Sequence, residues 1–238
     1  MSYFSDIRNL CWFLEPILEC DVRRLHRLVV NAAAEGYHVL VGTGSMQLFQ
    51  AALYALAPPT ADMPVSVVSL TPLYSSYPLV TDFLNSGLYR WAGDANTFDG
   101  DDYIEVICSP NNPDGGIRET ILKSKPGKAI HDLAYYWPQY TPITHMLAHD
   151  IMLFTMSKCT GHAGTRIGGD VNLLFHFARR EMVYRWRALR AAVATSGIFS
   201  LPDKVVGFCT FTKDTHLHGC VARRRKWKTW RASCVSTR

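Results

Sequence analysis

Hydrophobic residues recur at helical spacing near the start of the chain and in short continuous runs further along it. Between Pro16 and Ala34 the apolar residues lie three or four positions apart, which predicts a helix. Short apolar runs predict strands at 38–41, 65–70, 103–108, 129–133 and 151–155. Helical spacing also predicts helices at 47–56 and 77–84. Because strands of this kind alternate with helices, the pattern predicts an α/β fold with a mainly parallel sheet.

Polar and glycine residues cluster just after several of the predicted strands. The segment Gly42-Thr43-Gly44-Ser45 follows the first apolar run, and a stretch dense in turn residues begins at Ser109, after the third. In open parallel sheets, ligands bind beyond the carboxyl ends of the strands. We therefore expect one site there, built from these residues: Gly42 to Ser45, Tyr74, Asn112, Asp132, Tyr135, Thr155 and Lys158.

Charge is distributed unevenly along the chain. Residues 1–168 hold 11 Lys and Arg against 16 Asp and Glu, a net charge of −5, whereas residues 169–238 hold 14 against 4, a net charge of +10. The overall charge of +5 therefore describes the C-terminal part alone and does not indicate a nucleic-acid-binding protein. Spacing predicts a basic helix at 175–194, and no regular alternation of elements follows it. We interpret the run from Arg223 to Lys226 as random basic sequence.

The seven cysteines are scattered, odd in number and lack any CxxC pair. This pattern favours reduced thiols and a cytoplasmic protein. No apolar run is long enough to span a bilayer, and the first residues lack the pattern of a secretory signal. The segment from His216 to Cys220 has a spacing that matches no metal site, so we expect no metal.

Each candidate motif is ambiguous when it is taken alone. GTGS can present backbone N–H groups to a phosphate, but it is neither a P-loop nor a dinucleotide fingerprint, and by itself it favours a tight turn. The run SPNNPDG is a turn first. Asp132 could be a cap or loop residue, and Lys158 could emerge into solvent.

Together the motifs fit the chemistry of pyridoxal phosphate (PLP). This cofactor needs a lysine for its Schiff base and a carboxylate that keeps the pyridine nitrogen protonated, so that the ring acts as an electron sink. It also needs donors for its phenolic oxygen, an aromatic ring to stack on, and a helix N-terminus with an arginine for its phosphate. The sequence offers a candidate for every part.

Four segments of the chain closely resemble the plant alliinase and tryptophan-aminotransferase family. They are VGTGSMQLFQAALYAL, SPNNPDGGIRET, HDLAYYWPQYTPIT and HDIMLFTMSKCTGHAGTRIG. The resemblance implies the large domain of PLP-dependent fold type I, with a mainly parallel sheet flanked by helices. It also implies a homodimer whose active site lies at the subunit interface.

The resemblance assigns roles around the cofactor ring. It identifies Lys158 as the Schiff-base lysine and Asp132 as the partner of the pyridine nitrogen. Tyr135 and Asn112 match the residues on the phenolic oxygen, and Tyr74 stands where the ring-stacking aromatic belongs. Lys158, Asp132 and Tyr135 are therefore the expected catalytic residues.

The resemblance also assigns the phosphate ligands. Thr155, three positions before the lysine, and Arg166, eight after it, match two of them. The phosphate-facing turn is supplied by Gly44, Ser45 and Met46.

Two departures from the family pattern shape the expected domain organisation. The family's chains begin well before the equivalent of Met1, and the match is expected to end at Gly168. We therefore expect an N-terminal helical segment at 1–35 and an incomplete large domain at 36–168. Residues 169–238 are expected to be a poorly ordered basic tail that does not match the family. That tail would lack the small domain whose arginine binds the substrate carboxylate.

By resemblance, the expected activity is transamination of L-tryptophan to indole-3-pyruvate, a step in auxin biosynthesis. The reactants would be an amino acid and a 2-oxo acid. Two alternatives stay open: a carbon–sulfur lyase of the alliinase type, which shares the cofactor residues, and a truncated product without catalytic activity.

Overall fold

The computed structural model describes residues 16–58, 63–122, 127–159 and 171–201 of the 238-residue chain. The chain divides into two compact units. In the described residues, the first unit comprises 16–41 with 143–147, and the second comprises the rest. The first unit thus ends after Val41, a few residues beyond the boundary expected from the sequence.

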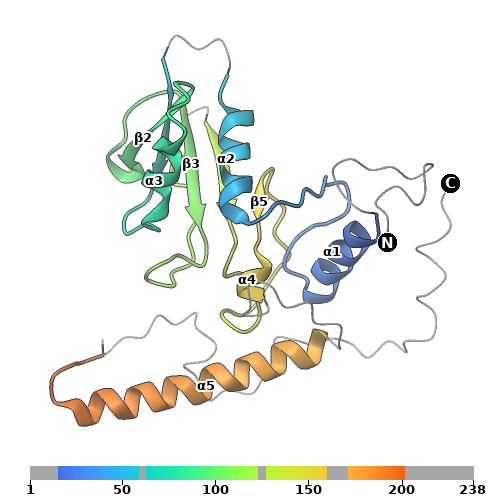
Figure 1. Cartoon of the computed structure of the whole chain (residues 1–238), viewed down its shortest axis with the longest axis vertical. Coiled ribbons are helices and arrows are strands. Elements are labelled where there is room, and N and C mark those ends of the chain that lie inside the picture. The colour runs from blue at the N-terminus through green and yellow to red at the C-terminus, as the bar shows by residue number, and fades with distance from the viewer. Residues whose placement is uncertain (1–15, 59–62, 123–126, 160–170, 202–238) are drawn as a thin grey trace. The chain divides into compact units, whose positions relative to one another are not determined.

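The first unit contains the helix α1, Pro16–Val29 (Figure 1). This helix is shorter than the predicted one because Val30 adopts a φ of 59°, a left-handed conformation that ends a helix. The Arg23 guanidinium bonds to the Glu19 carboxylate at 2.6 Å and to the carbonyl oxygen of Tyr37 at 2.7 Å, which fixes the chain that follows α1. The strand predicted at 38–41 does not form, and Leu40 is 70% exposed.

The second unit contains a five-stranded sheet with the order β2-β1-β3-β4-β5. All strand pairs are parallel, which confirms the predicted sheet type. The strands are β1 Val65–Ser69, β2 Tyr89–Asp94, β3 Tyr103–Cys108, β4 Lys128–Asp132 and β5 Met152–Leu153. Chain order reverses at β1, because β2 pairs on one side of it and β3 on the other. Such a reversal is where ligand sites form in α/β sheets.

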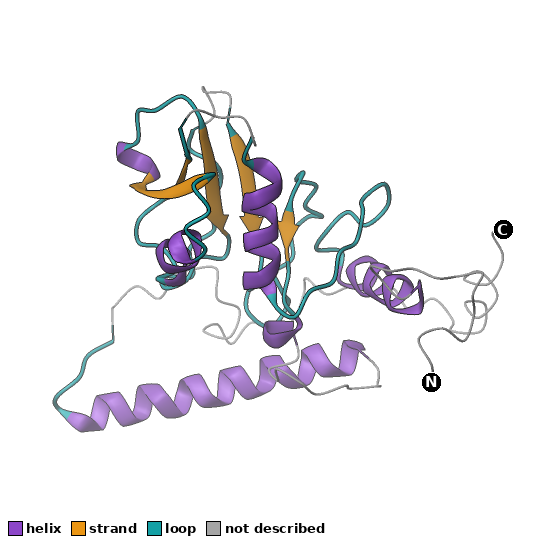
Figure 2. Cartoon of the chain, turned by 45° about the horizontal axis from the view of Figure 1, so that its top comes forward, coloured by secondary structure: helices purple, strands orange, loops and turns teal. Residues whose placement is uncertain are grey.

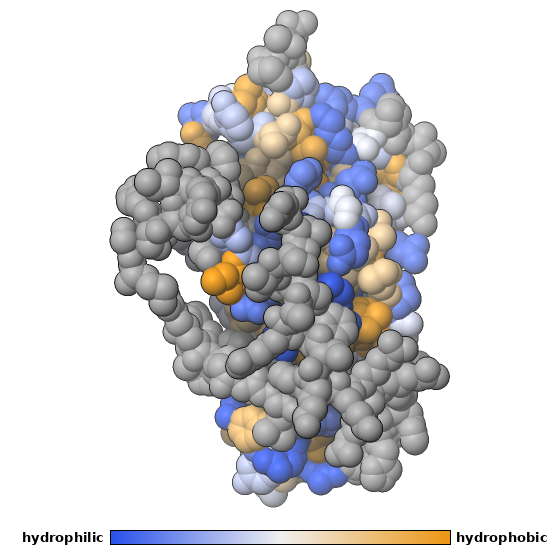
Figure 3. Space-filling model, turned by 90° about the vertical axis from the view of Figure 1, so that its right-hand side faces the viewer, coloured by the Kyte–Doolittle hydropathy of each residue, from blue (hydrophilic) through white to orange (hydrophobic). Residues whose placement is uncertain are grey.

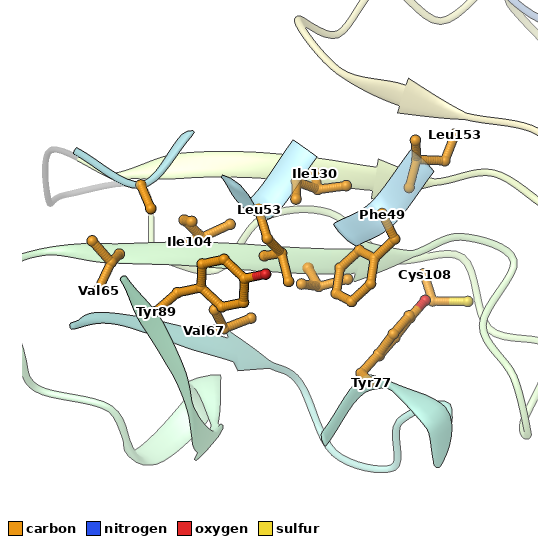
Figure 4. Close-up of a cluster of buried hydrophobic side chains, with 12 residues drawn as sticks. Phe49, Leu53, Val65, Val67, Tyr77, Tyr89, Ile104, Cys108, Ile130 and Leu153 are labelled. Carbon is orange, nitrogen blue, oxygen red and sulfur yellow. The ribbon is translucent and has the colours of Figure 1, made fainter. Parts of the chain in front are cut away.

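Two helices pack on one face of this sheet (Figure 2): α2, Ser45–Leu56, and α3, Ser76–Phe83. Because strand side chains alternate between faces, every second residue of β1, β3 and β4 meets the helices. The result is a core in which Phe49 and Leu53 of α2 lie against the strands, and Tyr77 of α3 closes one end (Figure 4). The other core residues are Ala57, Val65, Val67, Tyr89, Ile104, Val106, Cys108, Ile130 and Leu153.

The remaining elements follow the sheet or lie between its strands. They are the 3-10 helix η2, Ala95–Thr97, the single-turn helix α4, Met156–Cys159, and the long helix α5, Val171–Ser196. The basic helix predicted at 175–194 is therefore present, so this part of the expected tail is ordered. The Phe175 ring of α5 stacks on Trp137 with 6.1 Å between centroids.

Some large hydrophobic side chains stay exposed in the described part of the chain. Leu79 and Phe83 lie one turn apart on α3 and are 73% and 78% exposed. Tyr184 on α5 is also exposed. On the face drawn in Figure 3, hydrophobic residues lie at the surface among hydrophilic ones. Among the described helices, none is long and apolar enough to cross a lipid bilayer.

Candidate active site

A pocket of about 270 Å³ lies at the carboxyl ends of the strands in the second unit. In Figure 1 this is the end of the sheet next to α4. Nine of the ten site residues that the family resemblance assigns line it, and the tenth, Arg166, lies outside the described residues. Gly42 and Thr43, which were expected in the site from their place after a predicted strand, are not part of the lining. The lining is formed by Gly44, Ser45, Met46, Tyr74, Cys108, Asn112, Asp132, Ala134, Tyr135, Thr155, Ser157 and Lys158.

The N-terminus of α2 forms one wall of the pocket. The helix begins directly after Gly44, and Leu48 N–H donates to the Gly44 carbonyl at 3.3 Å. The preceding turn is braced by Gln47, whose Oε1 accepts the Thr43 N–H at 2.7 Å. The first N–H groups of a helix have no partner within the helix and carry its positive dipole end. This wall therefore suits an anion such as a phosphate.

Asp132 ends β4 and is only 4% exposed. Its two carboxylate oxygens each accept one hydrogen bond, from the Tyr77 hydroxyl at 2.6 Å and from the Ala134 N–H at 3.1 Å. Burial raises the pKa of Asp132, while these two donors act in the opposite direction. A buried carboxylate that lines a pocket is suited to pair with a cationic ring nitrogen.

Lys158 lies in α4 and lines the pocket together with the turn at Gly44. Its N–H bonds to the Thr155 carbonyl at 3.3 Å, and its own carbonyl accepts from Gln139 Nε2 at 2.8 Å. These contacts hold the lysine backbone at both ends of the turn. Its Nζ lies 5.1 Å from the centroid of the Tyr135 ring. Interaction with Tyr135 raises the pKa of the Lys158 ammonium, which burial opposes.

Tyr74 and Asn112 reach the pocket from the loops after β1 and β3. The two loops are tied together, because the neighbouring Asn111 donates from Nδ2 to the Pro72 carbonyl at 2.9 Å. The Tyr74 ring meets the Tyr77 ring edge-on, with 5.5 Å between centroids. The run SPNNPDG is thus both a turn, as its composition suggests, and part of the pocket lining.

Sequence reasoning missed several residues of the site. Cys108, Ala134 and Ser157 also line the pocket, and each is next to or near a strand end, so the strand-end rule could have included them. Tyr77 and Gln139 act one layer behind the lining, through Asp132 and Lys158. Nothing in the sequence pattern distinguishes these two from ordinary core residues.

The polar groups of the pocket fit PLP. A buried carboxylate, a lysine amine, a phenol, an amide and a helix N-terminus converge on one cavity, and these are the partners that the ring nitrogen, aldehyde, phenolic oxygen and phosphate require. Among the residues that the structure describes, no group of three His, Cys, Asp or Glu is placed to hold a metal ion.

Comparison with known proteins identifies similar sequences over most of the chain. The family model described as "Allinase" matches residues 1–172 and 169–219. In Oryza sativa subsp. japonica, tryptophan aminotransferase-related protein 1 is 59% identical over 90% of this chain and 61% of its own length. Tryptophan aminotransferase-related protein 2 of the same plant is 55% identical over 90% of this chain and 54% of its own length. This chain therefore spans little more than half the length of these relatives.

Two more distant similarities cover smaller parts of the chain. Alliin lyase 1 of Allium sativum is 41% identical over 71% of this chain and 35% of its own length. An aminotransferase from Neisseria meningitidis superposes with a TM-score of 0.49 at 20% identity, over 78% of this chain and 56% of that one.

The family match corrects the expectation that similarity to the family ends at Gly168. The second matched segment runs from 169 to 219, so similarity continues well beyond Gly168. Relative to rice protein 1, this chain lacks a stretch of positions inside the aligned region. The alignment with rice protein 1 spans 268 positions, but 90% of this 238-residue chain is only about 214 residues, so about 54 positions have no counterpart here. The two segments that the family model matches adjoin at residues 169–172.

Proposed function

Because the chain belongs to the allinase family, we propose that it binds pyridoxal phosphate in the strand-end pocket and acts as an aminotransferase on L-tryptophan. The supporting observation is the convergence of Lys158, Asp132 and Tyr135 with the N-terminus of α2 on one cavity. The individual residues are common in proteins, but this combination at the ends of parallel strands serves few other ligands.

Each group of the pocket would have a distinct task. Lys158 would hold the cofactor covalently, and Asp132 would pair with its ring nitrogen. Asn112 and Tyr135 would donate to the phenolic oxygen. The phosphate would lie at the α2 N-terminus, with Thr155 beside it. When bound, the cofactor supplies an electron sink for the bond electrons released at the substrate Cα.

The protein's own contribution to the reaction is proton transfer and orientation. Once its amine is free of the cofactor, Lys158 Nζ would take the proton from the substrate Cα as general base and return a proton as general acid. The Tyr135 interaction favours the ammonium form of Lys158 before cofactor binds. Buried Asp132 would keep the ring nitrogen protonated throughout.

The choice of tryptophan is supported by the more similar relatives. The rice proteins at 59% and 55% identity carry the name tryptophan aminotransferase-related, whereas the Allium sativum lyase is 41% identical. The reaction would convert L-tryptophan and a 2-oxo acid into indole-3-pyruvate and an amino acid, the step that feeds auxin biosynthesis. Carbon–sulfur lyase activity is the second candidate, because the family model itself bears the alliinase description.

The experiment titrates the purified chain with PLP, reduces it with borohydride and maps the labelled peptide by mass spectrometry. We expect the label on Lys158 and not on Lys128, which begins the same sheet's β4 at the far end from the pocket. Because borohydride fixes the cofactor on the protein, activity is measured on unreduced protein. One assay supplies tryptophan with a 2-oxo acid, and a second supplies S-alkyl-cysteine sulfoxide. Indole-3-pyruvate formation supports the proposal, and pyruvate released from the sulfoxide alone supports the lyase. A protein that takes up no cofactor refutes the proposal.

A further inference from the structure

Tyr77 occupies a position between three parts of the candidate site. Its ring belongs to α3 and is fully buried. It packs on Phe49 of α2, with 5.4 Å between ring centroids, and edge-on against Tyr74 at 5.5 Å. Its hydroxyl bonds to the Asp132 carboxylate. One side chain thus contacts the helix that would face the phosphate, the aromatic that would stack on the ring, and the carboxylate that would meet the ring nitrogen.

The surroundings of the Tyr77 hydroxyl explain why the bond to Asp132 matters. Cys108 and Asp132 are direct register partners on β3 and β4, on the same face of the sheet. Figure 4 shows the Tyr77 hydroxyl directed toward Cys108 at this end of the core. Burial raises the pKa of the Cys108 thiol to about 11 and keeps the Tyr77 phenol protonated as well. Tyr77 is therefore the donor and Asp132 the acceptor in this bond.

We propose that Tyr77 is a positioning residue that holds Asp132 as an oriented carboxylate, ready for the ring nitrogen of the cofactor. The proposal rests on the proposed function for its cofactor. A carboxylate has about four acceptor positions, so it can keep the Tyr77 and Ala134 donors and still accept from a protonated ring nitrogen. Without Tyr77, a carboxyl at 4% exposure would lose one of its two donors and favour the neutral acid.

The charged and titratable groups around Asp132 all come from the elements that enclose it. They are Tyr77 on α3, Cys108 on β3, and Tyr74, Tyr135 and Lys158 of the same pocket lining. Of these, Tyr77 alone has a direct hydrogen bond to the carboxylate in the described part of the chain. Its removal should therefore change the proton affinity of Asp132 more than any other single substitution that leaves the pocket lining intact.

The test compares Tyr77→Phe with Tyr89→Phe. Tyr89 is a tyrosine of the same core, 4% exposed, and its hydroxyl has no hydrogen-bond partner among the described residues. Both substitutions remove one buried hydroxyl and keep the ring. The first measurement follows the Asp132 carboxyl by carbon-13 NMR in the cofactor-free proteins, with Asp132→Asn used to assign the signal. We expect the Asp132 carboxyl to titrate at higher pH in Tyr77→Phe than in wild type. In Tyr89→Phe it should titrate at the same pH as in wild type. Coincident curves for all three proteins overturn the proposal.

The second measurement is PLP affinity as a function of pH. We expect Tyr77→Phe to bind about tenfold more weakly than wild type on the acid side of the profile, where loss of one charge-assisted bond leaves Asp132 protonated. The affinities should converge as the pH rises. An equal loss at every pH would mean that Tyr77 has a packing role only, which contradicts the proposal. If wild type binds no PLP, the proposed function fails, and the carbon-13 titration still decides whether Tyr77 controls Asp132.

Discussion

Acid should destabilise the fold through a pair of stacked histidines on the face of the sheet opposite α2 and α3. The rings of His131, in β4, and His149 lie 3.5 Å apart between centroids with an angle of 4° between their planes. His131 is 8% exposed. Burial, and then the proximity of His149, lowers its pKa to about 4, from 6.5 in an unfolded chain, while Asp150 opposes the shift. The folded protein therefore holds His131 neutral at pH values where the unfolded chain already binds a proton.

The sign and size of the effect follow from this difference. Well above pH 6.5, His131 is neutral in both the folded and the unfolded state, so it has no effect on the pH dependence of stability. As the pH falls from 6.5 toward 4, the unfolded state gains a proton that the folded state does not, so stability is lost across that window. Between pH 7.5 and pH 5 the loss amounts to about 2 kcal/mol. A typical domain has a free energy of unfolding of roughly 5–15 kcal/mol, so this is a large fraction of the total.

The assay is urea unfolding at pH 7.5, 6.5, 5.5 and 5.0, with wild type compared to His131→Phe. Phenylalanine keeps a flat ring against His149 but cannot bind a proton. Whatever its stability at pH 7.5, the free energy of unfolding of the variant should fall by about 2 kcal/mol less than that of wild type between pH 7.5 and pH 5. The exposed His38 provides the control, because His38→Phe should follow wild type. Parallel curves for wild type and His131→Phe would refute the assignment of acid sensitivity to this pair.

Three further outcomes can be checked on the same protein. Lys158→Ala should abolish the visible absorbance that PLP gains on covalent binding, and a borohydride-stable adduct persisting in this variant would contradict the assignment. Asp132→Asn should still bind the cofactor but lose most transaminase turnover, because a neutral amide does not favour a protonated ring nitrogen; near-wild-type rates would argue against its role. Leu53→Ala, at a fully buried position of α2, should lower the free energy of unfolding by about 3 kcal/mol in urea titrations, whereas the exposed Tyr54→Ala should change it by less than about 0.5 kcal/mol.

The sequence predicts the central strands well because they are buried on both faces. β3 is buried at all six positions, so its apolar run is continuous and easily recognised. β2 was missed because it is an edge strand of mixed composition, YRWAGD, which pairs on one side only. The strand predicted at 38–41 is wrong because Leu40 and Val41 are exposed, so the apolar run there does not correspond to burial in a sheet.

The pocket could be anticipated because one rule covers most of it. Residues that directly follow parallel strands meet at one edge of the sheet, whatever their distance along the chain. The rule does not reach groups that act from behind the lining. Tyr77 is separated from Asp132 by 55 positions and lies on a helix, so only the packing of α3 on the sheet brings its hydroxyl to the carboxylate. Residue patterns carry no information about that contact.

The internal gap in the alignment with the rice relative bears differently on cofactor binding and on turnover. Every strand whose end supplies a pocket residue lies before residue 160, and so do all the described lining residues. The alignment with the rice relative leaves about 54 internal positions without a counterpart in this chain. The described lining residues are all present in this chain, so the contacts proposed for the cofactor do not depend on the missing positions. Cofactor affinity and turnover should therefore respond differently to this gap. Affinity depends on groups that the chain retains, whereas turnover also depends on closing and orienting a substrate above them.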